Sequence, residues 1–309
     1  MTSRETDSVP GCGEDGRPVI GPVSAPALHV MSWNVRRPVP DVLTRAADRW
    51  RHRAPRVRAL LASERPTVLC AQEVVAEQVA VILDGLGRDY SVVGRGRSAD
   101  GGGEACPVFF DSRRLELVDW EQTALSATPE RAGSVSWGNL FPRVLVQARL
   151  RDRATGHEVL VVNTHLDPLS ARSRLRSVRA VLDAVTGRGL PAVVTGDLNA
   201  GPASGTVRAL LEDGMLADSW EAARTRRTDR WGTYAGYRPP RRGGERIDWI
   251  LTTGGLTVTD AAIHASPHLG GWPSDHLPVQ AVVRHGVGGP GGHNGTGADG
   301  RDEGGAGPT

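Results

Sequence analysis

Residues 192–199 read AVVTGDLN, and this stretch carries the clearest signal for both fold and site. Its first four residues are apolar, β-branched or small, which predicts a buried strand. Gly196 lets another chain segment approach closely, and Asp197 and Asn199 point to one side of an extended backbone because they are two residues apart. An Asx turn at Asp197 explains the pair equally well. The stretch therefore predicts a strand with polar groups at its end.

Polar residues also stand at the ends of other apolar runs. Asn34 follows residues 28–33, and Glu73 follows residues 68–71. Taken alone, each has an ordinary explanation, such as a turn asparagine or an acid that favours a helix N-terminus. The remaining strand-end groups are Asn163-Thr164-His165, Asp248 and Ser274-Asp275-His276. Because a scaffold presents functional groups at strand ends, we expect these residues to converge on one rim.

The apolar pattern predicts one α/β domain over residues 28–285. Strands are expected at residues 28–33, 68–71, 90–93, 107–110, 115–120, 143–150, 158–163, 192–195, 247–251, 257–260 and 279–284, and helices at 54–63, 76–83, 171–185 and 207–211. Hairpins with inserted helices favour two packed sheets covered by helices. Residues 1–27 lack periodicity and residues 286–309 are rich in glycine, so both segments are expected to be disordered.

The composition excludes several classes of protein. All 37 residues counted as Lys+Arg are arginine. The absence of lysine rules out Schiff-base enzymes and P-loop nucleotide hydrolases. A net charge of +2 is too small to indicate nucleic-acid binding by itself. The sequence has three cysteines without C-x-x-C spacing, no apolar run near the ~20 residues of a membrane span, and no signal-peptide pattern. We therefore expect a cytoplasmic protein.

The order of the strand-end motifs resembles that of the endonuclease/exonuclease/phosphatase superfamily, most closely its small bacterial metal-dependent hydrolases. The motifs run in the order Trp33-Asn34, Gln72-Glu73, Asn163-Thr164-His165-Leu166, Gly196-Asp197-Leu198-Asn199, Ile247-Asp248 and Ser274-Asp275-His276. The resemblance implies a four-layer α/β sandwich, with two mixed β-sheets flanked by helices and the active site at one end. Phe110 departs from the family, which usually has tyrosine there, and this puts substrate preference in doubt.

The resemblance also implies a role for each group in a divalent-metal-dependent phosphoester hydrolase. Mg²⁺, or alternatively Mn²⁺, is expected at hard oxygen donors, and an activated water would attack in line. The expected catalytic residues are His165, Asp197, Asn199, Asp248 and His276; the metal ligands are Asn34, Glu73 and Asp275; the substrate contacts are Arg36, Arg143 and Asn163. No G-x-S-x-G elbow is present, which argues against a serine triad at Ser274.

The substrate class stays open at the level of sequence. The phosphoester could belong to DNA, to RNA, or to a small molecule or lipid headgroup, and a non-catalytic anion- or nucleic-acid-binding module is a further alternative. No obligate protein partner is indicated. Many arginines between residues 224 and 246 alternate with Trp231, Tyr234 and Tyr237, which suits a phosphate backbone with stacked bases. A solvated loop in an arginine-biased chain explains this stretch equally well.

Overall fold

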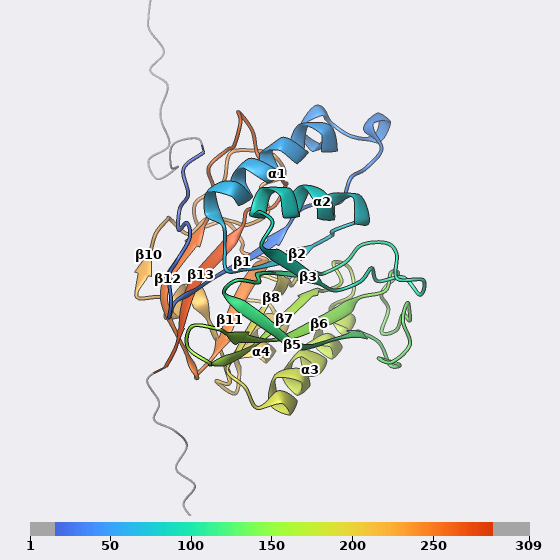
Figure 1. Cartoon of the computed structure of the whole chain (residues 1–309). Helices are drawn as coiled ribbons and strands as arrows, with labels where there is room; N and C mark the ends of the chain where they lie inside the picture. The colour runs from blue at the N-terminus through green and yellow to red at the C-terminus, as the bar shows by residue number, and fades with distance from the viewer. Residues whose placement is uncertain (1–15, 287–309) are drawn as a thin grey trace, which may run out of the picture.

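The computed structural model describes residues 16–286, and it consists of four layers (Figure 1). Helices α1 (Trp50–Glu64) and α2 (Ala76–Leu86) cover one side, and α3 (Ala171–Arg188) and α4 (Gly205–Leu211) cover the other. Two mixed β-sheets pack face to face between these helices. The four-layer α/β sandwich expected from the sequence is therefore confirmed.

The first sheet has the strand order β10-β12-β13-β1-β2-β4-β3 within the described residues. Its strands are β1 (Leu28–Asn34), β2 (Val68–Gln72), β3 (Tyr90–Val93), β4 (Val108–Asp111), β10 (Thr225–Arg226), β12 (Leu256–Ile263) and β13 (Val279–His285). Strand β1 runs parallel to β2 and antiparallel to β13. The parallel pair brings the ends of β1 and β2 to the same edge, so Asn34 lies opposite Gln72.

The second sheet has the order β5-β6-β7-β8-β11-β9. Its strands are β5 (Leu115–Ala124), β6 (Val144–Asp152), β7 (Glu158–His165), β8 (Ala192–Asp197), β9 (Leu216–Asp218) and β11 (Asp248–Thr253). Strands β7 and β8 are parallel, and β11 is antiparallel to β8. His165 and Asp248 consequently flank Asp197 in the register of the sheet.

Successive side chains of a strand point to opposite faces of its sheet, and this alternation builds three apolar layers. On β8, Val193 contributes to the cluster between the sheets, whereas Val194 packs with the residues beneath α3 and α4. On β1, Val30 belongs to the central cluster, whereas Met31 and Trp33 pack against α1 and α2. Both faces of each sheet are buried, which explains why these strands read as continuous apolar runs rather than as alternating ones.

Short capping motifs fix the limits of the outer helices. Ser170 accepts a hydrogen bond from the Ser173 backbone amide at the start of α3, and Gly189 ends this helix in the left-handed region at φ 60°. Ser204 caps α4 in the same way through the Val207 amide. Hydroxyl N-caps and a terminal glycine satisfy backbone groups that a helix cannot pair internally. The sequence therefore sets where these helices begin and end.

Several elements differ from the prediction. Helix α1 begins at Trp50, before the expected start at residue 54, and buried Arg53 anchors this extra turn by donating to the Asp48 carbonyl (2.8 Å). The short strands β9 and β10, helix α5 (Ser219–Ala222) and two 3₁₀ turns (Asp41–Leu43 and Ala46–Asp48) were not predicted. Such short pieces have too few residues to show a periodicity. No helix in residues 16–286 combines the length and the apolar character needed to cross a bilayer.

The expected disorder of the N-terminal segment is wrong for part of it. The backbone amides of Val19, Ile20 and Gly21 donate to the carboxylate of Glu64 at 2.7–3.2 Å. Glu64 ends α1 and is fully buried, so these three amides satisfy a charge that would otherwise be unpaired. The rest of the two segments expected to be disordered, residues 1–15 and 287–309, lies outside the described residues.

Candidate active site

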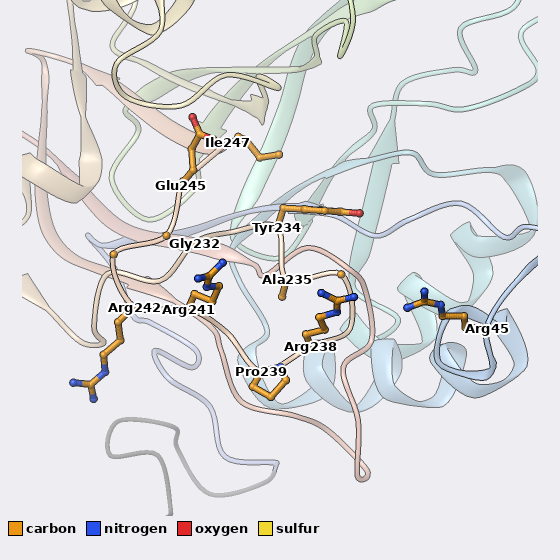
Figure 2. A pocket seen from close by; sticks show the side chains of 13 residues that line it. Arg45, Gly232, Tyr234, Ala235, Arg238, Pro239, Arg241, Arg242, Glu245 and Ile247 are labelled. Atoms are coloured by element: carbon orange, nitrogen blue, oxygen red, sulfur yellow. The ribbon is translucent and has the colours of Figure 1, made fainter.

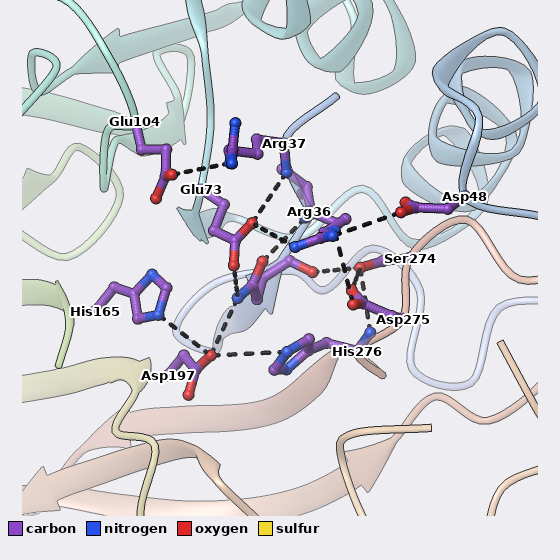
Figure 3. Close-up of polar contacts among 12 residues, drawn as sticks. Arg36, Arg37, Asp48, Glu73, Glu104, His165, Asp197, Ser274, Asp275 and His276 are labelled. Carbon is purple, nitrogen blue, oxygen red and sulfur yellow. Dashed lines mark hydrogen bonds and ion pairs between the residues drawn. The ribbon is translucent and has the colours of Figure 1, made fainter. Parts of the chain in front are cut away.

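The strand-end polar groups converge on one cleft at the ends of both sheets (Figure 3). The cleft has a volume of about 550 Å³. Its lining includes most of the expected site residues: Arg36, Glu73, Arg143, His165, Asp197, Asn199, Asp275 and His276. Asn34 and Asp248 lie directly behind these groups and are hydrogen-bonded to them. The convergence follows from the strand register rather than from closeness in sequence.

Asn34 joins the two sheets at the floor of the cleft. Its Nδ2 donates to Glu73 Oε1 (3.1 Å) and to Asp197 Oδ2 (3.0 Å), and its Oδ1 accepts from the Arg36 backbone amide (2.9 Å). The amide orientation is thereby fixed, because each end faces a partner of the opposite kind. Asn34 therefore holds the carboxylates of the two sheets at a fixed separation.

Glu73 is held as a carboxylate. Burial alone would raise its pKa, but His165, the Asn34 side chain, the Arg37 backbone amide and Arg36 together lower the pKa to about 2. His165 is itself protonated at the low pH where Glu73 titrates, which is why it stabilises the anion there. Glu73 has a positive φ of 58°, an uncommon conformation for this residue type that recurs at functional sites. A half-buried, ionised oxygen donor therefore faces the cleft.

His276 and Asp248 form a hydrogen-bonded ion pair. His276 Nδ1 lies 2.9 Å from Asp248 Oδ2, and both residues are buried. Burial would lower the pKa of His276, but the charges of Asp248 and Asp197 outweigh it and raise the pKa to about 10. His276 is thus protonated at neutral pH. Its Nε2, directed toward Asp197 Oδ2 at 3.8 Å, then carries a proton at the cleft.

His165 has the opposite protonation state. Burial is the largest influence and lowers its pKa to about 4, although Asp197 opposes this shift. Asn199 Nδ2 donates to the Leu166 carbonyl (2.9 Å) and lies 3.1 Å from His165 Nε2. Because the amide nitrogen is a donor, Nε2 accepts and the imidazole is neutral. The geometry and the direction of the pKa shift therefore agree.

Asp197 lies between these two histidines. Its Oδ2 is 3.6 Å from His165 Nε2 and 3.8 Å from His276 Nε2, and its Oδ1 accepts from the Asn199 backbone amide (2.9 Å). This last hydrogen bond forms the Asx turn that the sequence also suggested. Asp197 is therefore both a turn residue and a residue of the cleft. Burial and the charge of Asp248 raise the pKa of Asp197 against the opposing effect of the histidines. A carboxylate with a raised pKa is better suited to accept a proton than an ordinary aspartate.

Four arginines, Arg36, Arg37, Arg97 and Arg143, line the cleft, and two of them lie beside its acids and its wall. Arg36 lies 3.8 Å from Glu73 Oε2, 3.8 Å from Asp275 Oδ2 and 3.5 Å from Asp48 Oδ2. Arg143 is only 5% exposed, and its Nε and Nη1 have no hydrogen-bond partner among the described residues. A buried guanidinium with unused donors at a cleft wall suits an anionic ligand.

The donor set at Glu73 fits a divalent cation. The Arg36 guanidinium lies between Glu73 and Asp275 without a direct hydrogen bond to either carboxylate. The space between these two carboxylates therefore favours positive charge. The carboxylate oxygens of Glu73 and Asp275 are the hard ligands that Mg²⁺ prefers, and Asn34 Oδ1, which accepts from the Arg36 amide, has a second lone pair for the same ion. Asp197, Asp248 and His276 also lie close enough to surround an ion. In that second set, His276 Nδ1 already lies 2.9 Å from Asp248 Oδ2, so these two groups satisfy one another.

Asn163 does not lie where the sequence prediction puts it. It is fully buried between the sheets, and its Nδ2 donates to the carbonyls of Ala71 (2.9 Å) and Pro107 (3.0 Å). Its Oδ1 accepts from Gln72 Nε2 (2.8 Å) and Thr195 Oγ1 (3.2 Å). With these contacts and no place in the cleft lining, Asn163 is a link between the sheets and not a substrate contact.

Sequence reasoning missed Arg53, which supports the cleft from behind. It is fully buried, and its guanidinium donates to backbone carbonyls of three segments that meet at the site. These carbonyls belong to Asp48 (2.8 Å), Val35 (2.8 Å), Arg36 (3.1 Å), Arg37 (3.2 Å) and Pro273 (3.5 Å). The sequence signal that could have identified Arg53 as buried is its helical spacing, because it precedes the core residues Val57 and Leu60 by four and seven positions.

Fold and site together define a four-layer α/β sandwich protein with its polar groups gathered at one end of two packed sheets. Residues 31–276 match the model of the Endonuclease/Exonuclease/phosphatase family, and the chain belongs to this family. The resemblance inferred from the order of the motifs is therefore confirmed.

Solved structures agree with this assignment. An endonuclease/exonuclease/phosphatase family protein from Bacteroides thetaiotaomicron is 25% identical, with a TM-score of 0.78 over 84% of this chain and 98% of that one. A mannosyl-6-phosphatase from Bacteroides thetaiotaomicron is 26% identical, with a TM-score of 0.77 over 83% and 99%. TDP2 from D. rerio, complexed with a single-strand DNA product, is 18% identical with a TM-score of 0.61 over 84% and 99%, a likeness of fold alone. No curated protein matches the chain.

Proposed function

We propose that this protein hydrolyses phosphate esters by attack of water in a Mg²⁺-dependent reaction. The observation that carries the proposal is the position of Asp197. One of its carboxylate oxygens lies within 3.0 Å of Asn34 Nδ2 and within 3.8 Å of both a neutral and a protonated imidazole. A base with a raised pKa beside a protonated donor is the arrangement that water attack on an ester needs.

The residues divide the chemistry among them. Asp197 orients the attacking water and accepts its proton, and the Asn199 amide holds the carboxylate in place. As the water oxygen bonds to phosphorus, the bond from phosphorus to the ester oxygen breaks, and the leaving oxygen takes a proton from solvent in the cleft. Protonated His276 donates to a phosphoryl oxygen, and Asp248 keeps that imidazole charged and correctly oriented. Arg143 uses its free guanidinium donors on another phosphoryl oxygen. Mg²⁺, when bound by Glu73 with Asn34 and Asp275, would neutralise charge on the phosphoryl group; Mn²⁺ is the alternative ion.

Two classes of ester remain candidates, and a different observation supports each. The mannosyl-6-phosphatase at 26% identity supports a phosphomonoester of a small molecule. The open cleft, with Arg36, Arg37, Arg97 and Arg143 in its lining, supports a nucleic-acid phosphodiester. Binding without catalysis would not need a protonated and a neutral histidine on either side of a buried aspartate. A cytoplasmic location stays a prediction from the cysteine content.

A substrate panel tests the proposal. Purified protein is assayed with sugar phosphates, inositol phosphates, bis-p-nitrophenyl phosphate, single-stranded DNA and an abasic-site duplex. Each assay is run with millimolar Mg²⁺ or with excess EDTA, at about physiological ionic strength. We expect turnover of at least one member and its loss with EDTA. Turnover unaffected by EDTA would contradict the metal dependence. Tight binding of several members without turnover of any would favour the non-catalytic module instead.

A further inference from the structure

A second cavity, larger than the catalytic cleft, adjoins it (Figure 2). It has a volume of about 1050 Å³, and Tyr234 lines both spaces. The Tyr234 ring packs edge-on against His276, with 5.1 Å between the ring centroids. A single phosphate fills only a small part of this volume, so a ligand held at His276 has room to continue past Tyr234.

An ordered loop forms the wall of this cavity. Gly232 N donates to the Arg241 carbonyl (2.9 Å), and Gly243 N donates to the Arg230 carbonyl (2.8 Å). The same loop is bonded to the catalytic segment, because the amides of Ala235 and Gly236 donate to the Asp275 carbonyl at 2.8 and 3.0 Å. The wall is therefore preorganised relative to His276, which lowers the entropic cost of using it for binding.

Three guanidinium groups of this cavity have no partner. The exposed side chains of Arg45, Arg238 and Arg241 make no ion pair or hydrogen bond with any part of residues 16–286. Figure 2 shows Arg45 reaching toward Arg238 from the segment that precedes α1. The one acid in the lining, Glu245, points away from these arginines and packs against Gly201. The cavity thus carries uncompensated positive charge.

Other arginines of the same stretch are already used by the fold. Arg226 pairs with Glu221 (3.2 Å) and Arg227 pairs with Asp260. Arg242 pairs with Asp229 at 2.8 Å. These three arginines stabilise the loop, whereas the unpaired guanidinium groups of Arg45, Arg238 and Arg241 line the cavity.

One part of the catalytic cleft's rim carries exposed apolar side chains. Leu140, Phe141 and Leu169 line it and are 57–75% exposed. Arg97 lies over the Phe141 ring, 5.4 Å from its centroid, so this rim combines apolar side chains with one guanidinium. The arginines without partners lie in the adjoining cavity beyond Tyr234.

We propose that Arg45, Arg238 and Arg241 form a second anion subsite, which binds a phosphate group of the substrate other than the one that is cleaved. This inference rests on the proposed function, because it assumes that the scissile phosphate lies at His276. The shared chemistry is an additional phosphate, supplied either by the next nucleotides of a nucleic-acid strand or by a multiply phosphorylated small molecule. The subsite selects such substrates over esters with a single phosphate.

Equilibrium binding in EDTA tests the subsite without requiring hydrolysis. The probes are a fluorescein-labelled thymidine octanucleotide, followed by anisotropy, and inositol hexakisphosphate, followed by calorimetry. Arg238→Gln/Arg241→Gln is compared with Arg88→Gln/Arg176→Gln, a charge-matched pair at exposed positions outside both cavities. Thermal melting checks that both variants are folded.

We expect the Arg238→Gln/Arg241→Gln protein to bind its ligand on the order of 10-fold more weakly than the control pair. With the oligonucleotide, the slope of log affinity against log salt should fall by about 1–2. A loss confined to the octanucleotide assigns the subsite to a strand, and a loss confined to the inositol phosphate assigns it to a small molecule. Equal affinities of the two variants for both probes, or no binding of either probe by the wild-type protein, overturns the subsite. Loss of hydrolysis alone bears on the proposed function and leaves this binding result unaffected.

Discussion

At the residue scale, the site depends on two imidazoles held in opposite charge states. His276 faces buried carboxylates, so its pKa is raised, whereas burial dominates at His165 and lowers the pKa. Both lie within 4 Å of the same oxygen of Asp197. Three residues of the site, Arg36, Glu73 and Asn199, also have positive φ angles between 48° and 58°. Backbone strain of this kind is retained where it positions functional groups.

Asp248→Asn should move the alkaline limb of the pH–rate profile to lower pH. His276 stays protonated below its pKa of about 10 because Asp248 and Asp197 outweigh burial. Without the Asp248 charge, burial regains influence and the His276 pKa falls, so the proton is lost earlier as pH rises. The profile of kcat/KM between pH 6 and 11 measures this shift, with Asp183→Asn on exposed α3 as the control. An unchanged limb, together with an unchanged imidazole titration by NMR, would refute the role of Asp248.

At the element scale, one side chain joins the loops that follow β1 to the segment before β13. Arg53→Met should lower the free energy of unfolding by about 3 kcal/mol, because five backbone carbonyls lose a charged donor at once. Urea denaturation measures the loss, and Arg176→Met on exposed α3 is the control. A change below 0.5 kcal/mol, near that of a typical surface substitution, would show that Arg53 does not hold these loops.

The close approach of β7 and β8 depends on a glycine. A Cβ added at Gly196 would collide with the Thr164 backbone carbonyl, which cannot move without disturbing the parallel pairing. Gly196→Ala should therefore destabilise the fold by about 2–3 kcal/mol. Gly187→Ala is the matched control, because the same added atom meets nothing within 4 Å and should be neutral or slightly stabilising. Equal unfolding midpoints for the two variants would contradict this packing account.

The sequence predicted the regular elements and most of the cleft, for reasons visible at this scale. Asp197, His165 and His276 follow or precede long apolar runs, so strand pairing alone carries them to one edge. Asn163 has the same sequence context but faces the interior between the sheets, and only the register shows this. Arg53 and the unpaired Arg238 were indistinguishable from other arginines, because partner formation depends on contacts between segments far apart in the chain.

At the scale of the whole molecule, the absence of lysine means that every basic side chain other than histidine is a permanently charged arginine. The pH dependence of stability is therefore governed by carboxylates and histidines below pH 8. The described residues include three buried histidines, His165, His264 and His276, whose pKa values are strongly shifted. Stability should consequently show a marked optimum rather than a broad plateau.

The free energy of unfolding should be greatest near pH 6.5. Burial lowers the pKa of His165 and His264 to about 4. Between pH 6.5 and pH 4, these two histidines are therefore protonated in the unfolded chain but not in the native state, and the free energy of unfolding falls as the pH falls. The pKa of His276 is raised to about 10, so its stabilising contribution is complete below pH 6.5 and is lost as pH rises to 10. Between its unfolded and native pKa values, each histidine changes the free energy of unfolding by about 1.4 kcal/mol per pH unit. Urea unfolding from pH 5 to 9 measures this, and a continuous rise across the range would contradict it.

The central claim is that water attacks a phosphate ester beside Asp197. The most direct measurement compares the wild-type protein with Asp197→Asn on the best substrate of the panel, at saturating Mg²⁺ and substrate, with both proteins shown to be folded by thermal melting. Removal of the base should lower kcat by about 10²–10⁴-fold while substrate binding in EDTA persists. A kcat within a few-fold of wild type would place the chemistry elsewhere and contradict the account.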